Sequence, residues 1–351
     1  MEENIERLKS ILQDCTLCPR RCRVDRTRGA KGFCDLDDRL RVERTLPHHG
    51  EEPPLSGHRG AGTIFFSSCN LKCSYCQNHQ ISHRANGSFL GVDGLVRAML
   101  DLQARGCHNV EAVTPTPQLP GLAEAIFCAR GSGLTVPVVF NCGGYEDPGI
   151  LRLAEGLVNV YLPDFKYGDD RLAEELSGVG DYTRFASASL EEMIRQAGCG
   201  LQRENGLAVQ GVVVRHLILP GHIENSFAAL KRLRFILPQT VPISLMSQYS
   251  PVPSVKDHPL LSRRISKEEY ERVVHFALDL GFEELFVQDV DEKALSPDFS
   301  RENPFDWQGA ESLNPMISAG NVPRHDEPKS GNPPLSFLLP QAPPYGRAEK
   351  E

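Results

Sequence analysis

The chain has 351 residues, which is long enough for one large α/β domain with an appended segment. Its formal net charge of −8 argues against a general nucleic-acid binder, because such proteins present a basic face to phosphates. The first residues are acidic, and no run approaches the roughly 18 apolar residues of a membrane span. We therefore expect a cytoplasmic protein whose partners are small molecules or proteins, with neither nucleic acid nor membrane among them.

Four cysteines lie close together near the N-terminus, at Cys15, Cys18, Cys22 and Cys34. In a reducing compartment such cysteines serve as metal ligands or buried thiols more often than as disulfides. Four thiolates from one short loop can close a tetrahedral zinc shell or hold an iron–sulfur cluster, and the ligand type alone does not decide between the two. The sequence therefore predicts a metal site of one of these kinds.

The same segment carries an isolated run of basic residues in an acidic protein. The run could dock a nucleic acid or an acidic protein, but a four-thiolate site is itself negative and would be offset by nearby cations. We favour this local role, because no aromatic platform for bases is interleaved with the arginines. The basic residues are Arg20, Arg21, Arg23, Arg26, Arg28 and Lys31. Residues 39–60, with Pro53 and Pro54, are predicted to form a connector into the core.

From Thr63 onward, apolar strand-like runs alternate with helical patterns, which predicts a parallel sheet arranged as an open or partial (β/α) barrel. Helices are expected over 93–105 and 267–280, the second with a capping box of Ser266 and Glu269 and a stop at Gly281. The predicted strands are 63–67, 109–114, 136–141, 158–164, 211–219, 241–247 and 285–289.

Directly after the first of these strands come Cys69, Cys73 and Cys76. A [4Fe–4S] cluster is normally held by four cysteines, so three thiolates leave one iron without a protein ligand. An open coordination position is reactive, as it is in catalytic zinc sites. Three buried thiols or half of a zinc site are the alternatives, but the loop position and polar neighbours favour the cluster.

Polar residues follow each of the later strands. In a barrel the reactive face lies at the carboxyl ends of the strands, so these side chains are expected to converge on the cysteine loop. Taken singly, each is also typical of a strand-end cap or turn. The candidates are Thr114, Thr116, Asn141, Asp164, Lys166, Arg215 and Gln248.

The C-x3-C-x2-C spacing, with Tyr75 before the third cysteine, resembles the signature of the radical S-adenosylmethionine (SAM) enzymes. The resemblance implies that the open iron chelates SAM and that an electron from the cluster cleaves it to a 5′-deoxyadenosyl radical. A partial TIM-like barrel of the radical SAM type, preceded by a cysteine-rich extension, is the implied fold.

Within that family, residues 60 to 290 resemble the proteins similar to pyruvate formate-lyase activating enzyme. The likeness implies that Lys166 pairs with the SAM carboxylate, that Asp164 lies at the same end of SAM, and that Arg215 also contacts SAM. It further implies a glycyl radical enzyme as protein substrate and a flavodoxin- or ferredoxin-type reductant. The Tyr75 backbone would lie near the adenine.

Two positions depart from the family pattern. The Gly-Gly-Glu that binds the SAM amine is absent, and Thr114-Pro115-Thr116 stands there instead, so threonine oxygens or main-chain carbonyls would have to serve. The histidine that contacts the ribose has Gln248 or Tyr249 as its nearest counterpart. Asn141, at the end of the third strand, is a further cofactor-binding candidate.

Several residues receive structural interpretations only. Cys107, Cys128 and Cys199 are expected to be core thiols, and Cys142 a buried thiol near the site. His216 and His222 are expected to be hydrogen-bonding residues of a loop rather than general bases.

Three regions are predicted along the chain. They are an N-terminal extension over 1–60, a core over 61–308, and a proline-rich tail over 309–351. The tail composition cannot bury enough apolar surface to offset the entropy of ordering, so we expect it to be mostly disordered, with 335–339 as a docking patch.

The sequence thus supports a radical SAM enzyme that activates a glycyl radical enzyme or another protein. Two alternatives stay open: radical modification of a small molecule or peptide, and a passive iron–sulfur or zinc module for binding or electron transfer.

Overall fold

The computed structural model describes residues 1–290 and 297–305 and the backbone of 317–318. The strands are β1 (Leu40–His48), β2 (Ala61–Phe66), β3 (Ser88–Leu90), β4 (Val110–Val113), β5 (Val138–Cys142), β6 (Val160–Pro163), β7 (Leu201–Glu204), β8 (Leu207–Val212), β9 (Val214–Leu217), β10 (Ile243–Met246), β11 (Leu285–Val287) and β12 (Ile317–Ser318).

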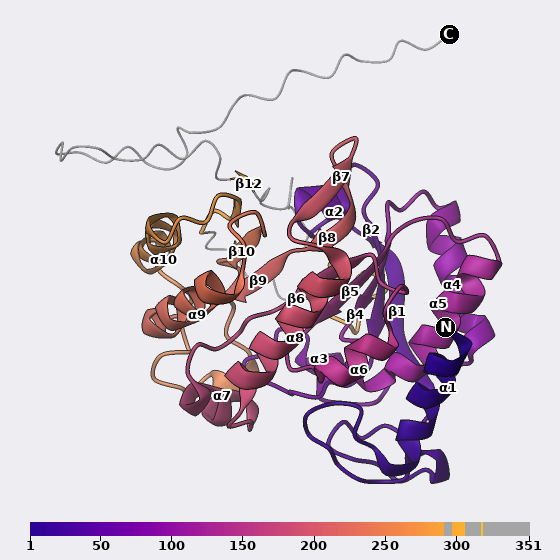
Figure 1. The fold of residues 1–351 in the computed structure, drawn as a ribbon. Coiled ribbons are helices and arrows are strands. Elements are labelled where there is room, and N and C mark those ends of the chain that lie inside the picture. Colours follow the sequence, from indigo (N-terminus) through magenta and orange to yellow (C-terminus); the bar gives the residue numbers. More distant parts are fainter. Residues whose placement is uncertain (291–296, 306–316, 319–351) are drawn as a thin grey trace, which may run out of the picture.

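The helices cover the outer side of the strands (Figure 1). They are α1 (Glu2–Ser10), α2 (Pro53–Ser56), α3 (His79–Ser82), α4 (Val92–Ala104), α5 (Leu119–Gly131), α6 (Pro148–Leu153), α7 (Asp170–Ser177), α8 (Tyr182–Ala197), α9 (Ile223–Ile236) and α10 (Lys267–Asp279). Among the described residues, no helix is long and apolar enough to span a bilayer.

Two sheets form one curved wall. Their strand orders are β3-β1-β2-β4-β5-β6-β8-β7 and β12-β11-β10-β9. Only Val213 separates β8 from β9; β8 pairs in parallel with β6, and β9 pairs in parallel with β10. Within the described residues, no pairing joins β11 back to β2, so the barrel is open. The predicted partial (β/α) barrel is confirmed.

Side chains alternate between the two faces of this wall, as the twofold period of a strand requires. One row in register, Ile64, Ala112, Phe140 and Tyr161, belongs to the main apolar core beneath the helices. The next row, with Phe65, Val113 and Asn141, faces the inside of the barrel, where Phe65 and Val113 pack with Ile81 and Phe299. The barrel interior is therefore lined by side chains from alternate positions.

Each predicted strand has an observed counterpart, and the helices over 93–105 and 267–280 correspond to α4 and α10. The capping box of Ser266 and Glu269 is present, and Gly281 follows α10 with a φ of +81°. The predicted strand 211–219 covers the end of β8 and all of β9. The two are separate strands because the chain passes from one sheet to the other at Val213.

The prediction of a connector over 39–60 is wrong. Residues 40–48 form β1, which pairs antiparallel with β2 from His48 opposite Ala61 to Val42 opposite Phe66. Its mixed burial pattern gives no clean alternation, so the strand could not be recognised from hydrophobic periodicity.

Two predicted core thiols are also misplaced. Cys128 and Cys199 are exposed, whereas Cys107 and Cys142 are buried as expected. His216 lies in β9 rather than in a loop, but it is the expected hydrogen-bonding residue: its ring nitrogens face the Phe165 carbonyl at 2.6 Å and the Ser226 hydroxyl at 2.9 Å. The predicted tail over 309–351 lies outside the described residues except for β12.

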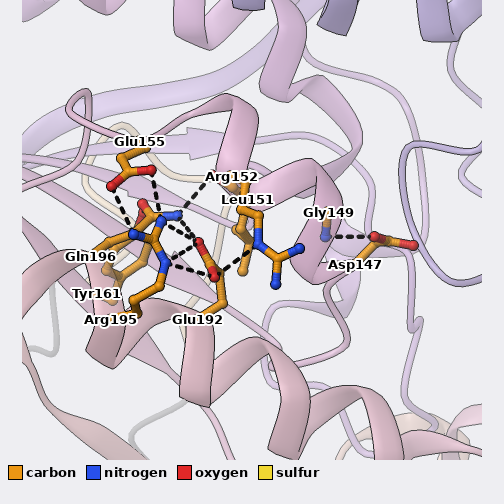
Figure 2. A network of polar contacts seen from close by, with 9 residues as sticks. All are labelled: Asp147, Gly149, Leu151, Arg152, Glu155, Tyr161, Glu192, Arg195 and Gln196. Carbon is orange, nitrogen blue, oxygen red and sulfur yellow. Dashed lines mark hydrogen bonds and ion pairs between the residues drawn. The ribbon is translucent and has the colours of Figure 1, made fainter.

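A polar network joins α8 to α6 and, through the Tyr161 hydroxyl, which donates to Gln196 at 2.5 Å, to β6 (Figure 2). Glu192 accepts hydrogen bonds from Arg152, Arg195 and Gln196, and Arg195 also binds Glu155. Burial favours a higher pKa for Glu192, but these hydrogen bonds outweigh it and lower the pKa from 4.5 to about 2. The ionised carboxylate therefore stabilises the fold above pH 4.5, and this contribution is lost as the pH falls through 2.

We expect Glu192→Gln to lower the free energy of unfolding by roughly 2–3 kcal/mol at neutral pH, with little difference from wild type in strong acid. Urea denaturation across a pH series measures this. The matched control is Glu191→Gln, since Glu191 is the exposed neighbour on the same helix. Equal losses in the two variants, or a loss that does not shrink in acid, would contradict the assignment.

Candidate functional site

The loop after β2 carries the three cysteines in a strained backbone. Ser68 and Lys72, on either side of Cys69, have φ values of +72° and +51°, which are costly for residues other than glycine. Contacts hold this conformation: the Ser68 amide donates to the Ile81 carbonyl at 2.8 Å, and the Leu71 amide donates to the Cys69 sulfur at 3.3 Å. Strain of this kind is typical of loops whose shape serves a ligand.

The loop thiols are protected from water. Cys73 is buried, and Cys69 and Cys76 are half-buried. Burial, with Cys73 nearby, raises the pKa of Cys69 to about 12 and that of Cys76 to about 11. These groups therefore become thiolates when a metal displaces their protons, which is the usual coupling between metal binding and protonation.

The donor set of the cysteine loop bears on the kind of metal group. Cys69, Cys73 and Cys76 lie close enough together for Cys73 to raise the pKa of both other thiols. A [4Fe–4S] cube binds each thiolate at a different iron, so three thiolates leave its fourth iron without a protein ligand. The three thiols of this loop fit such a cube.

Lys166 provides the cation beside this loop. Its ammonium pairs with the Asp164 carboxylate just beyond β6. Burial would lower the pKa of Lys166, but Asp164 and Cys73 outweigh burial and raise it. The same cation acts on Cys76, whose pKa it lowers against the effect of burial. The predicted Asp–Lys pair thus lies close to the cysteine loop as a stable charge.

The backbone around Lys166 is fixed from three sides. The Tyr182 hydroxyl accepts from the Lys166 amide at 2.8 Å and lies 3.0 Å from the carbonyls of Gly143 and Asp164. Asn225 donates to the Lys166 carbonyl at 3.0 Å. Little conformational entropy therefore remains to be lost when Lys166 binds an anion.

A cavity of about 160 Å³ extends from the end of the cysteine loop into the barrel. We call it the barrel cavity. Asn141, Arg215 and Gln248 line it, so three of the predicted site residues come together there. The other lining residues are His48, Gly50, Glu51, Phe65, Gln77, Asn78, Val113, Met246, Pro297 and Phe305.

Arg215 lies deep in the barrel cavity and not in the open. Its guanidinium binds Glu52 with contacts of 2.8 and 2.5 Å and also pairs with Glu51. Burial disfavours the charged form, but the two glutamates raise the pKa of Arg215 well above its usual value. The predicted contact of Arg215 with SAM would therefore compete with two carboxylates that already hold it.

A third carboxyl group lies inside the barrel on β4. Glu111 is fully buried, and its Oε1 accepts a hydrogen bond from Asn141 at 2.7 Å. Burial, with Glu51 adding to it, raises the pKa of Glu111 well above its usual value. Its Oε2 is buried and has no hydrogen-bond partner in the described structure.

The remaining candidates have mixed positions. The Thr116 hydroxyl donates to Glu146 at 2.9 Å, which leaves it committed within the protein. Thr114 has a φ of +57° at the end of β4, and its amide donates to the Asn141 carbonyl. The ring of Tyr75 is buried against Tyr167 and Tyr249.

The four N-terminal cysteines line one separate cavity. They lie next to the cysteine loop, because the Ser68 hydroxyl donates to the Cys34 carbonyl. In Figure 1 the indigo segment after α1 runs along the side of the barrel that carries α3 and α7, opposite to α2.

Comparison with protein families identifies the core of this arrangement. Residues 63–233, from β2 to α9, match the family model described as the radical SAM superfamily. The chain carries a radical SAM domain. Such domains use a [4Fe–4S] cluster and SAM, so these two predicted cofactors and the enzyme class are confirmed, whereas the second metal site and the likeness to pyruvate formate-lyase activating enzyme stay predictions.

Individual relatives of the radical SAM chain are distant. The uncharacterized protein MJ0674 of Methanocaldococcus jannaschii is 29% identical over 292 residues, covering 79% of this chain and 78% of that protein. Among solved structures, methylornithine synthase (PylB) is 15% identical, with a TM-score of 0.47 over 82% of this chain and 71% of that one. SuiB of Streptococcus suis bound to S-adenosylmethionine is 13% identical, with a TM-score of 0.42 over 60% and 45%.

Sequence reasoning missed the charged group inside the barrel. Glu111 left a usable signal, since a carboxylate in a short buried strand is unusual. No comparable signal marks Glu51, Glu52 and His48, because these residues lie on the unexpected strand β1 or in the turn after it.

The position of Lys166 also depends on Gly144, whose φ is +79°. A Cβ at this residue would lie 2.0 Å from the Asp164 carbonyl oxygen. We expect Gly144→Ala to displace the segment from Asp164 to Lys166, lowering both the free energy of unfolding and the affinity for SAM. Calorimetric unfolding and SAM titration of the anaerobic protein would measure the two effects.

Gly206 supplies the matched control, because its φ is +82° and a Cβ there would meet nothing within 4 Å. Gly206→Ala should cost only the backbone strain of about 1–2 kcal/mol and leave SAM binding unchanged. If the two alanine variants bound SAM equally well, Gly144 would have no part in placing Lys166.

Proposed function

We propose that Cys69, Cys73 and Cys76 hold the [4Fe–4S] cluster of this radical SAM enzyme and leave one iron open for SAM. When bound and reduced, the cluster supplies the electron that cleaves SAM to methionine and a 5′-deoxyadenosyl radical. The observation that carries the proposal is the convergence of a strained three-cysteine loop, the Lys166–Asp164 pair and the barrel cavity at one end of the parallel strands.

Lys166 and Asp164 would bind the amino-acid end of SAM. The ammonium of Lys166 suits the SAM carboxylate. The Asp164 carboxylate suits the SAM amine, because the glutamate that binds this amine in the family pattern is absent from this chain. Thr116 is a weaker amine ligand than Asp164, because its side chain is buried and its uncharged hydroxyl already donates to Glu146. We therefore assign the amine to Asp164 and to main-chain carbonyls of the cysteine loop.

Asn141 and Gln248 would face the nucleoside or the substrate. Both line the barrel cavity, and Gln248 is fixed by its carbonyl, which accepts from Gln77 at 2.8 Å. Gln77 directly follows Cys76, so this hydrogen bond ties the cluster loop to the end of β10. His48 and Phe305 also line this cavity, and their rings pack 4.1 Å apart.

For the substrate, we infer a glycine on a partner protein as the first candidate. This inference depends on the motif likeness around Asp164 to Lys166 and from Arg215 to Gly221. A small polar molecule is the second candidate, and the barrel cavity favours it: the volume is about 160 Å³ and the base carries Arg215 and Glu51. A flavodoxin- or ferredoxin-type protein would supply the electron.

The cleavage reaction is tested with anaerobically reconstituted protein, dithionite and SAM. We expect 5′-deoxyadenosine from wild type and none from Cys73→Ala, because two thiolates cannot hold the site-differentiated cluster. The control is Cys128→Ala, which removes an exposed thiol and should leave product formation unchanged. A wild-type protein with a full cluster but no nucleoside product would refute the proposal.

In the same assay, Lys166→Met should weaken SAM binding about tenfold to a hundredfold, as expected for the loss of one charged hydrogen bond. Lys231→Met removes a lysine from α9 and serves as its control. Equal affinities in these two variants would place SAM elsewhere.

The two substrate candidates differ in their radical product. Activation of a protein should give a glycyl radical signal by electron paramagnetic resonance (EPR) in a partner incubated with enzyme, SAM and reductant. A small-molecule substrate should instead raise 5′-deoxyadenosine formation without any protein radical. Glu111→Gln keeps the shape of the buried side chain. This variant should alter turnover if the substrate is a small molecule and leave it unchanged if the substrate is a protein.

A further inference from the structure

The cavity lined by Cys15, Cys18, Cys22 and Cys34, which we call the N-terminal cysteine pocket, is built around its sulfur atoms. Its loop doubles back on itself, since the Cys15 amide donates to the Val24 carbonyl at 2.9 Å. Gly32 makes room for the pocket: a Cβ there would lie 2.7 Å from the Cys22 sulfur. Shape and composition together indicate a ligand site.

The basic residues of this segment fall into two groups. Four of them pair with nearby carboxylates, and the pairs are Arg21–Asp147, Arg23–Asp14, Arg28–Asp25 and Lys31–Asp35. Arg20 and Arg26 line the pocket, as Arg21 also does, but no carboxylate in the described part of the chain forms an ion pair with Arg20 or Arg26.

Arg26 is the more telling of the two because it is only 2% exposed. Its guanidinium donates to the Asp37 carbonyl at 3.0 and 2.6 Å, which satisfies hydrogen bonds but leaves the charge uncompensated. An unpaired buried cation is unfavourable. Four thiolates bound to a metal group would make the pocket negative and so offset this charge.

Four cysteines can hold either a zinc ion or a [4Fe–4S] cluster, and the thiolates alone do not decide between the two. The place of the pocket in the fold favours the cluster, because zinc does not exchange electrons, whereas an iron–sulfur cluster next to the cysteine loop can exchange them.

The pocket also shares a wall with the SAM-cluster loop. Asn70 lines the pocket, and its Oδ1 lies 3.7 Å from the Cys69 sulfur. Arg20 donates to the Asn70 carbonyl at 2.8 Å and stacks on Phe33, which is partly exposed to solvent. Asn70 therefore lies between the two sets of cysteines, and the exposed Phe33 forms part of the pocket wall.

We propose that the N-terminal cysteine pocket holds a second [4Fe–4S] cluster that passes single electrons to the cluster of the Cys69–Cys76 loop. A one-electron protein reductant of the flavodoxin or ferredoxin class reduces the second cluster by one electron. That electron moves to the first cluster and the second returns to its oxidised state, with all four thiolates remaining bound. The relay rests on the proposed function, whereas the presence of the second cluster does not.

The cluster is tested in a chain in which Cys69, Cys73 and Cys76 are all replaced by alanine. After anaerobic reconstitution this variant should keep about four iron and four sulfide per chain and give an EPR signal when dithionite reduces it. One zinc ion without iron, or no bound metal, would overturn the proposal. This measurement needs neither SAM nor turnover.

The relay is tested by comparing reductants in Cys18→Ser, with Cys128→Ser as the matched control. Dithionite is small enough to reduce the first cluster directly, so Cys18→Ser should still form 5′-deoxyadenosine with it. With reduced flavodoxin, product formation should be lost in Cys18→Ser and kept in the control. Equal retention under both reductants would overturn the relay.

If Cys18→Ser does not fold, Arg26→Met in the triple-alanine chain provides the decisive measurement. Removing a buried positive charge beside the second cluster should move its midpoint potential to a more negative value, and an unchanged potential would overturn its placement in the pocket. Absence of 5′-deoxyadenosine from wild type with either reductant would refute the proposed function, while the iron content of the triple-alanine chain would still decide the second cluster.

Discussion

The alternation of side chains along the parallel strands is the constraint on which the rest of the structure depends. Outward rows such as Ile64, Ala112 and Phe140 join the helices in an apolar core that holds the wall in shape. The positions that face the inside of the barrel do not contribute to this core, and Glu111, Asn141 and Arg215 occupy three of them. Because parallel strands end on one side, the loops that carry the cysteines, Asp164 and Lys166 gather there as well.

Burying a charged side chain inside a barrel is unfavourable, and in this chain ion pairs between buried side chains offset the cost. Arg215 is bound by two carboxylates from the turn after β1, and breaking such a buried group by removing one partner typically costs about 3–5 kcal/mol. Glu111 differs, since burial raises its pKa and so favours the neutral form of the side chain. The cavity thus offers a substrate one fixed ion group, formed by Arg215 and Glu51.

Local patterns predicted the parts of this molecule that local physics determines. The strand–helix alternation, the capping box of α10 and the C-x3-C-x2-C loop are all readable within short windows of sequence. The strand β1 was missed because its burial pattern has no clean periodicity, and the Arg215–Glu52 contact because it joins residues 163 positions apart. Exposure of Cys128 likewise depends on which face of α5 packs inward, which a weakly amphipathic helix does not reveal.

The two cysteine sets differ by one ligand, and that difference separates their chemistry. Three thiolates leave an iron that can bind and cleave a substrate, whereas four close the coordination shell and leave only electron exchange. In the proposed relay, the closed site serves to pass an electron to the open one. The shared wall at Asn70 and the hydrogen bond from Ser68 to Cys34 bring the two sets of cysteines together as this requires. A protein reductant would then act at the closed site, while the open iron would stay beside Lys166 and the barrel cavity. Such a separation would allow the radical to be formed away from water without isolating the site from its source of electrons.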